Sequence, residues 1–543
     1  MTRRIVRTII QLGLFGFCSF LFLYMLDNQY GVLPTSIHSH LPAHHPGLII
    51  ADVHLQYCNL LNPLTSCKLD PSKWHRIEKD LYLNSGLVQK AYLHIKRKKE
   101  EELTAEDKVV LDVKIGRLDP AMGEKGEDNE KWESRGSGIW LKRSAKRHDS
   151  DSNNVITAID ILFGADAVEP RPGWEIKDTP LLLSSDGVPE ARISVRRGSP
   201  KKVEKPIPRI RKDGKFKIMQ VADLHLSTGL GACRDPEPKE HNGGKCDADP
   251  RTLEFVERLL DDEKPDLVVL TGDQVNGDTA KDAQTAIYKY AHVFIERNIP
   301  YAGIFGNHDD EGSLSRQGQM ALIESLPYSL SEAGPNTIEG VGNYYVEVLA
   351  HGTSAHSALT LYLLDTHAYS PNEAQFKGYD WLKPDQIEWF QNTVRELRTV
   401  HKHYTKIHLD MAFIHIPLPE YTEPAEIFGN RKEGVTAPGF NTHFKDALVE
   451  ASVPIVTCGH DHVNDYCALA KTDEGQPELW MCYGGGAGFG GYGGYNGYVR
   501  RIRLFEIDTN EARIRTWKRL EYGDTETRLD EQVIVEAGRP FGG

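Results

Sequence analysis

The 543-residue sequence has no excess of basic residues: 64 lysines and arginines stand against 78 acidic residues, for a formal net charge of -14 at pH 7. A protein that binds a nucleic-acid backbone needs a basic face, so we predict no nucleic-acid partner. The chain also lacks any Asn-x-Ser/Thr sequon in which x is not proline. That absence counts against a long residence in the secretory lumen.

Cysteine is scarce, with eight residues in the whole chain. Cys18 lies in the apolar N-terminal run and the other seven lie beyond it. Cys58 and Cys67 bracket one short loop, and Cys233 and Cys246 bracket another, so both pairs could be disulfides in an oxidising lumen. Reduced thiols are the alternative, because an odd number leaves at least one cysteine free or paired with another chain.

One apolar run has the length of a membrane span: residues 8–26 carry no charge,. Arg3, Arg4 and Arg7 precede it. The positive-inside rule therefore predicts a type II single-pass anchor in the secretory or vacuolar system, and a domain facing the cytosol is the other topology. No small-x-small site follows the run, which favours an anchor over a cleaved signal peptide.

Shifts in composition divide the rest of the chain. We predict an anchor at 1–27, a linker at 28–47, a β-rich domain with a charged insertion at 48–197, a basic, proline-rich linker at 198–213 and an α/β domain at 214–543. In the last domain, apolar runs alternate with amphipathic helical patterns. This alternation predicts a parallel or mixed sheet with helices on its faces.

Five strand-like apolar runs of that domain end in residue types that bind metals. The run 266–273, D-L-V-V-L-T-G-D, is typical of a strand buried on both faces, and Asp273 emerges at the edge where α/β sheets place their ligands,. A single D-x-H or G-D motif occurs by chance in many chains, but five in series predict a metal centre. The other four runs end at Asp223 and His225, at Asn307, His308 and Asp309, at His415, and at His460 and His462.

This series resembles the signature of the calcineurin-like metallophosphoesterase superfamily over about residues 215–508. The resemblance implies a β-sandwich of two mixed sheets flanked by helices, with two metals at the strand ends and Asp273 bridging them. Mixed nitrogen and oxygen ligands suit Zn, Fe or Mn better than Ca. The implied ligands are Asp223, His225, Asp273 and His462 for one metal, and Asp273, Asn307, His415 and His460 for the other.

The resemblance also implies a chemistry, in which two metals turn a bridging water into hydroxide for in-line attack at phosphorus. His308 would stabilise the developing charge or protonate the leaving oxygen, with Asp309 orienting its imidazole; a structural role for His308 is the alternative. We therefore predict a phosphomonoesterase whose partner is a phosphorylated substrate, phosphoproteins included. A phosphodiesterase or pyrophosphatase, or a non-catalytic membrane scaffold, are the alternatives, and the sequence indicates no oligomeric state.

Within the superfamily, the chain is most similar to purple acid phosphatase-like proteins, especially membrane-anchored fungal ones. The similarity rests on V-A-D-L-H-L, on the insertion between Cys233 and Cys246, on G-H-D-H-V-N-D-Y-C and on a late Gly-Tyr run. The metal-binding tyrosine of the purple enzymes is replaced by Asn276, which predicts a colourless centre and leaves the metal open.

The glycine run at 484–497 lacks the Lys-Ser or Lys-Thr of a phosphate-binding P-loop, so we predict a flexible loop near the mouth of the site, with plain turn structure as the more conservative interpretation of its tyrosines,. Its tyrosines are candidate substrate-facing aromatics. Two residues between the late ligand motifs could contact phosphate or lie on the surface. These candidates are Tyr492, Tyr495 and Tyr498, and Arg431 and His443.

Overall fold

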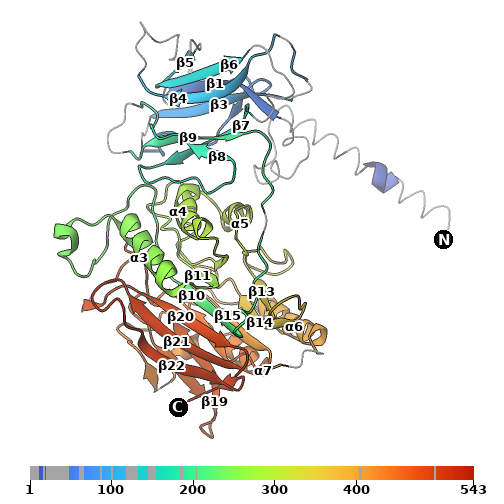
Figure 1. Cartoon of the computed structure of the whole chain (residues 1–543), viewed down its shortest axis with the longest axis vertical. Helices are drawn as coiled ribbons and strands as arrows, with labels where there is room; N and C mark the ends of the chain where they lie inside the picture. Colours follow the sequence, from blue (N-terminus) through green and yellow to red (C-terminus); the bar gives the residue numbers. More distant parts are fainter. Residues whose placement is uncertain are drawn as a thin grey trace. The chain divides into compact units, whose positions relative to one another are not determined.

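The computed structural model folds into two compact units, one formed by residues 1–162 with 173–201 and the other by 163–172 with 202–543 (Figure 1). Each unit has its own sheets and its own buried residues. The structure describes residues 11–15, 19, 48–59, 61, 66–85, 88–99, 102–104, 106–117, 132–144, 154–183, 188–203, 205–402, 406–424, 426–493 and 497–542.

The structure contradicts the predicted transmembrane anchor. It therefore also contradicts the predicted single-pass topology. Across the ranges just given, no helix combines the length and the apolar character that crossing a membrane requires. Of residues 8–26 only 11–15 and 19 are described, and they are helical. The rest of that stretch and the linker predicted at 28–47 lie outside the described residues.

Where the structure describes the N-terminal unit, it forms three small sheets of three strands each, which confirms the prediction of a β-rich N-terminal region. Buried and half-buried positions alternate along its longest strand, as expected where one face of a sheet meets a core,. Cys58 and Cys67 form a disulfide at the end of that strand. In sheet order the strands are β1 (Leu48–Asn59), β3 (Gln89–Lys99) and β2 (His75–Arg76); β4 (Val109–Ile115), β6 (Ile139–Ser144) and β5 (Trp132–Gly136); and β7 (Ile156–Phe163), β9 (Ala191–Arg197) and β8 (Trp174–Ile176).

The second unit contains two mixed sheets of seven strands, and this architecture confirms the predicted α/β sandwich. In the first sheet the parallel strands lie at one end and antiparallel strands continue from them, whereas in the second sheet the parallel strands lie at the centre with antiparallel strands on both sides. The first sheet runs β12 (Tyr301–Ile304), β11 (Leu267–Thr271), β10 (Lys215–Val221), β20 (Arg501–Asp508), β21 (Arg513–Leu520), β22 (Leu529–Glu536) and β23 (Arg539–Pro540). The second runs β13 (Tyr344–Leu349), β14 (Ser357–Leu363), β15 (Leu409–Phe413), β17 (Ile455–Cys458), β19 (Pro477–Tyr483), β18 (Cys467–Lys471) and β16 (Ile427–Phe428).

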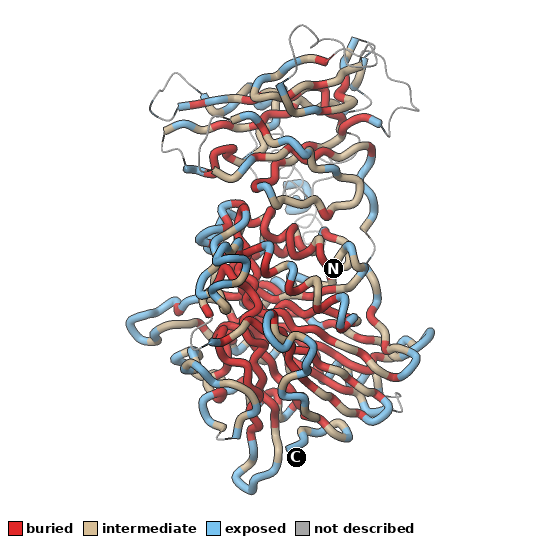
Figure 2. The backbone as a smooth tube through the Cα atoms, turned by 60° about the vertical axis from the view of Figure 1, so that its left-hand side comes forward, coloured by how far each residue is buried: buried red, intermediate tan, exposed pale blue. Residues whose placement is uncertain are grey.

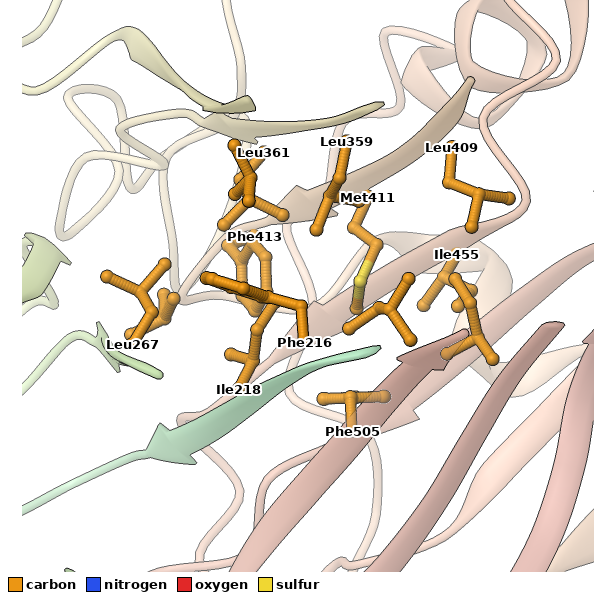
Figure 3. Packing of buried hydrophobic residues seen from close by; sticks show 14 of the residues in the cluster. Phe216, Ile218, Leu267, Leu359, Leu361, Leu409, Met411, Phe413, Ile455 and Phe505 are labelled. Carbon is orange, nitrogen blue, oxygen red and sulfur yellow. The ribbon is translucent and has the colours of Figure 1, made fainter. Parts of the chain in front are cut away.

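The main core lies between these two sheets (Figure 3). Phe216 and Ile218 of β10 pack there with Met411 and Phe413 of β15. The residue between the latter two, Ala412, faces the other side of its sheet, because successive side chains of a strand alternate,. On that side it meets helices α6 and α7. The helices of this unit are α3 (Ala248–Glu263), α4 (Ala283–Glu296), α5 (Arg316–Glu324), α6 (Pro384–Val400) and α7 (Phe444–Glu450).

The second unit contains two further disulfides. Cys233–Cys246 closes the loop before α3, so both cysteine pairs singled out in the sequence are bonded. Cys467–Cys482 joins residues that lie directly opposite each other on β18 and β19. Among the described cysteines, only Cys458 is free, and it is buried.

Candidate metal centre

The seven predicted ligands lie together at the carboxyl ends of five parallel strands. Asp223 and His225 follow β10, Asp273 follows β11, and Asn307 follows β12. Each of the seven side chains is buried. Parallel strands bring their carboxyl ends to one edge of a sheet, and here the edges of both sheets contribute. The remaining ligands are His415 after β15, and His460 and His462 after β17.

Four of these residues have a left-handed backbone conformation, which residues other than glycine rarely adopt. The φ angles are 58° at Asp223, 48° at His225, 52° at Asp273 and 77° at His460. Left-handed backbone costs free energy, and it persists where the surrounding structure holds it for a function. The sharp turns it makes direct each side chain back towards the strand ends.

Neighbouring glycines leave room for the ligands. A Cβ on Gly272 would collide with the ring of His415, and a Cβ on Gly306 would collide with Asp273. The glycines of the G-D and G-N-H-D motifs are therefore required by close packing within the site itself.

One group of ligand atoms comes from Asp223, His225, Asp273 and His462, and all of them lie within 4.8 Å of one another. The Nε2 atoms of His225 and His462 are 3.1 Å apart. The Oδ2 atom of Asp273 lies 3.5 Å from Nε2 of His225, and Oδ1 of Asp223 lies 3.6 Å from Nε2 of His462. Two carboxylates and two imidazoles thus point at one small volume.

A second group, Asp273, His415 and His460, meets the same criterion. Nε2 of His415 lies 3.4 Å from Oδ2 of Asp273 and 3.3 Å from Nδ1 of His460. Oδ1 of Asn307 is 3.2 Å from the same Nε2 atom. Asp273 belongs to both groups, and a carboxylate has two oxygens with which to bridge two cations.

The hydrogen bonds of the imidazoles turn lone pairs towards the centre. Nδ1 of His415 lies 2.8 Å from the carbonyl oxygen of Thr271, and Nδ1 of His462 lies 2.7 Å from that of Tyr492. A carbonyl only accepts, so both Nδ1 atoms carry the hydrogen and both Nε2 atoms face inward without one in the neutral rings. Such oriented imidazoles are typical metal ligands.

The electrostatics of the site call for a positive charge at its centre. Burial raises the pKa of the Asp223 carboxyl. It lowers the pKa of the His225 and His460 imidazoles to about 3. Burial also opposes ionisation of His415, but Asp273 and Asp223 raise the pKa of its imidazole to about 9. A proton on His415 is therefore the charge that balances the carboxylates, and cations bound by these nitrogen and oxygen donors would take over that role.

The glycine run packs directly on two of the ligands, a position that its sequence did not predict. A Cβ on Gly491 would lie 2.5 Å from the rings of both His225 and His462. The ring of Tyr492 stacks on that of His462 at 3.9 Å and 10°. Residues 484–490 are buried, so the run is a wall behind the ligands rather than turns at the mouth of the site.

The other sequence candidates have different outcomes. Tyr498 is buried under Arg501, and Tyr495 lies outside the described residues. Arg431 lies over the ring of Tyr466 at 5.9 Å. His443 is largely exposed, 3.6 Å from Asp446. These contacts place Tyr498, Arg431 and His443 in packing and surface roles.

His308 lies beside the metal centre, but the predicted role of Asp309 is wrong. The Asp309 carboxylate accepts hydrogen bonds from the backbone N–H groups of Asp273, Val275 and Gly306, at 2.6–2.9 Å. Nδ1 of His308 instead lies 2.8 Å from Oε2 of Glu311. Adjacent residues of a tight turn point in different directions, so the nearest acid in the sequence is not the nearest in space. Asp309 holds the loops that carry the ligands, and Glu311 orients His308.

Comparison with known proteins adds to this geometry. The family model of calcineurin-like phosphoesterases matches residues 216–464. Phosphatase DCR2 of Saccharomyces cerevisiae is 41% identical over 404 residues, which cover 71% of this chain and 68% of that protein. An uncharacterized protein of Schizosaccharomyces pombe is 34% identical over 502 residues, 90% of each chain. A protein of Arabidopsis thaliana called probable inactive purple acid phosphatase 29 is 36% identical over 349 residues, 59% of this chain and 86% of its own.

Proposed function

The chain belongs to the calcineurin-like phosphoesterase family, and from that premise we propose that it hydrolyses phosphomonoesters, phosphoproteins included, at a dinuclear metal centre. The observation that carries the proposal is the convergence of two buried ligand groups that share Asp273. A single structural metal would need only one of them. Two cations on a shared carboxylate are the arrangement that serves phosphoryl transfer.

In this proposal Asp223, His225, Asp273 and His462 hold one metal, and Asp273, Asn307, His415 and His460 hold the other. Zn, Fe and Mn fit these donors. When bound, the pair supplies Lewis acidity at phosphorus and a water of lowered pKa. The chain itself keeps the lone pairs aimed inward through the carbonyl oxygens of Thr271 and Tyr492.

His308 is the proposed proton donor to the leaving oxygen. Its backbone N–H donates to Oδ1 of Asp273 at 2.9 Å, which ties the His308 loop to the shared carboxylate. Its ring lies 5.4 Å from that of His225, and its side chain is 34% exposed. Glu311, on Nδ1, holds the ring in that position and stabilises the positive charge from which the proton is given up,.

The word inactive in the name of the Arabidopsis relative suggests a second candidate function for this chain. In that case the chain would bind metal or phosphate without turnover. A full set of ligands in this chain favours hydrolysis. The two candidates differ in turnover and not in metal content.

The test is to strip the protein of metal, restore Zn, Mn or Fe in turn, and assay p-nitrophenyl phosphate, bis(p-nitrophenyl) phosphate and pyrophosphate. We expect two metal ions per chain and the highest kcat/KM on the monoester. A higher kcat/KM on the diester or on pyrophosphate would assign the alternative reaction. Two bound ions without turnover of any substrate would assign the binding protein, and fewer than two ions would refute the dinuclear centre.

A further inference from the structure

An aromatic wall stands at the mouth of the metal centre, and the proposed reaction does not use it. Tyr369 and Tyr379 stack with ring centroids 5.7 Å apart and an angle of 24°. Tyr379 meets the ring of His460 edge-on at 4.4 Å. We call Tyr369 and Tyr379 the tyrosine wall.

The tyrosine wall is built by one segment between β14 and α6 that folds back on itself. The N–H of Ser370 donates to the carbonyl of Gly378, and the N–H of Asp380 donates to that of Ala368. This pairing places the two tyrosines opposite each other. The same segment carries Phe376 and Trp381, which pack with the partly exposed Phe440 at 5.0–5.2 Å.

The hydroxyl of Tyr369 is tied to the catalytic machinery. It lies 3.4 Å from Nδ2 of Asn307 and 3.1 Å from Oε1 of Glu311. The amide donates and the carboxylate accepts, so the hydroxyl links a ligand of the second metal to the residue that orients His308. These bonds fix the position of the Tyr369 ring, while 48% of the residue stays exposed to solvent.

The location of the exposed ring identifies what it meets. The ring of Tyr369 lies 6.4 Å from that of His308. A group whose oxygen is protonated by His308 leaves beside that side chain, and therefore close to the ring of Tyr369, which stands at 80° to the imidazole. A half-exposed ring that hydrogen bonds fix in place offers an aromatic contact surface at a low entropic cost.

We infer that the tyrosine wall is a leaving-group subsite that selects phosphomonoesters whose organic part carries a planar aromatic ring within one or two bonds of the ester oxygen. This inference rests on the proposed function, since it concerns the same centre. The acids beside the tyrosine wall already have partners, Asp310 with Arg316 at 3.3 Å and Glu311 with His308 at 2.8 Å. The selection therefore rests on the flat shape of the aromatic ring rather than on its charge.

Benzyl phosphate and cyclohexylmethyl phosphate form the decisive substrate pair. Both are esters of primary alcohols of similar size and similar acidity, so the intrinsic reactivity of the leaving group does not separate them. An aromatic pair contributes about two- to tenfold beyond area burial. We expect the wild-type protein to prefer benzyl phosphate in kcat/KM by that factor, mostly through KM.

Three variants locate the preference. Tyr369→Leu should bring the ratio of the two kcat/KM values to about one. Tyr369→Phe should keep a reduced preference, because the ring is retained but the hydrogen bonds that fix it are lost,. Tyr522→Leu is the control, since Tyr522 is 45% exposed in the second unit and packs on His241. A ratio that survives Tyr369→Leu would overturn the inference.

A binding measurement separates this inference from the proposed function. Calorimetry with benzylphosphonate and cyclohexylmethylphosphonate, on the metal-loaded protein, needs no turnover. We expect the aromatic phosphonate to bind more tightly in the wild type and in Tyr369→Phe, and equally with its partner in Tyr369→Leu. Equal binding to the wild type refutes the subsite even if the protein is a phosphatase. Selective binding without hydrolysis refutes the proposed function and leaves the subsite standing.

Discussion

The two units of the chain use charged side chains in different ways. In the N-terminal unit, Arg135 and Arg143 pair with Asp52 and Glu133, and these four side chains are 16–22% exposed. In the second unit, the Lys289–Asp249 pair is 1% exposed on both sides. Figure 2 shows a related contrast in burial: along the N-terminal strands buried residues are interrupted by half-buried and exposed ones, whereas in the second unit they form long continuous stretches.

The contacts of the buried Lys289–Asp249 pair explain why the second unit buries these charges. Nζ of Lys289 donates to the carbonyls of Ser227 and Gly229, at 3.0 and 2.7 Å, and to Asp249 at 2.8 Å. Asp249 in turn accepts the N–H of Ser227, two residues beyond His225. The buried Lys289–Asp249 pair therefore holds a loop that carries a ligand, whereas the N-terminal network ties strands together near the surface.

The largest expected effect comes from replacing Asp273, the ligand that both groups in the second unit share. Asp273→Asn removes the charge common to both ligand groups, and we expect hydrolysis to fall by at least about a thousandfold. The far-ultraviolet circular dichroism should not change, because the amide keeps the shape of the side chain. Asp52→Asn in the N-terminal unit is the matched control, with unchanged kcat/KM. Retained turnover in Asp273→Asn would contradict the ligand assignment.

The next effect compares the two charge networks directly. Lys289→Met removes the cation that pairs with the buried Asp249 and the partly buried Asp166, and such a loss costs about 3–5 kcal/mol of unfolding free energy,. Arg135→Met, at the partly exposed network, should cost about 1 kcal/mol or less. Urea unfolding of both variants measures the two costs. Similar midpoint shifts would show that burial does not distinguish the networks.

A smaller effect, on metal affinity, is expected from a substitution in the glycine run at 484–497. Gly491→Ala places a methyl group against His225 and His462, and displaced ligands should lower metal affinity about 10- to 100-fold,. Gly116→Ala in the N-terminal unit is the control, because nothing lies within 4 Å of the added methyl group. Competition with a metal-sensitive dye gives both affinities. Equal metal affinities of the two variants would mean that the backbone of the glycine run shifts to accommodate the methyl group without displacing the ligands.

The ligands were predictable because each one follows an apolar strand pattern. The run before Asp273 reads as a buried strand from its composition alone, and a parallel strand implies a ligand at its carboxyl end. The α/β class follows from the alternation of such runs with helical patterns. Local patterns thus indicated the α/β class and the candidate residues, whereas the two-sheet sandwich and the choice of ligands among those candidates were implied by the family resemblance.

Other features depend on contacts that no local pattern encodes. Glu311 is the partner of His308 because of how one turn bends, and sequence adjacency pointed to Asp309 instead. Cys467 and Cys482 meet through the register of two strands. The glycine run reads as flexible, but its lack of side chains is what lets it pack on the ligands. The tyrosine wall lies in a segment with no periodicity, so its stacking appears only in three dimensions.

The last comparison is a pH dependence of stability whose sign differs between the two units. Burial raises the pKa of Asp249 to about 7. Between about pH 4 and 7 the folded state thus keeps a proton that the unfolded state has lost, so stability falls as pH rises, by at most about 1.4 kcal/mol per pH unit. For Glu133, burial works in the opposite direction, but hydrogen bonds from Arg135, Arg143 and Lys108 hold its pKa at about 2. Its contribution is present above about pH 4.5 and is lost as pH falls towards 2.

Differences between wild type and variant isolate each group from the other titrations. The stability difference between the wild-type protein and Asp249→Asn should change steadily from pH 4.5 to 7, with the variant gaining relative stability as pH rises. The difference for Glu133→Gln should stay constant over that range and shrink only below pH 4.5. Urea midpoints across the pH series measure both. A flat difference for Asp249→Asn would mean that Lys289 keeps Asp249 ionised, and the two units would then share one sign of pH dependence.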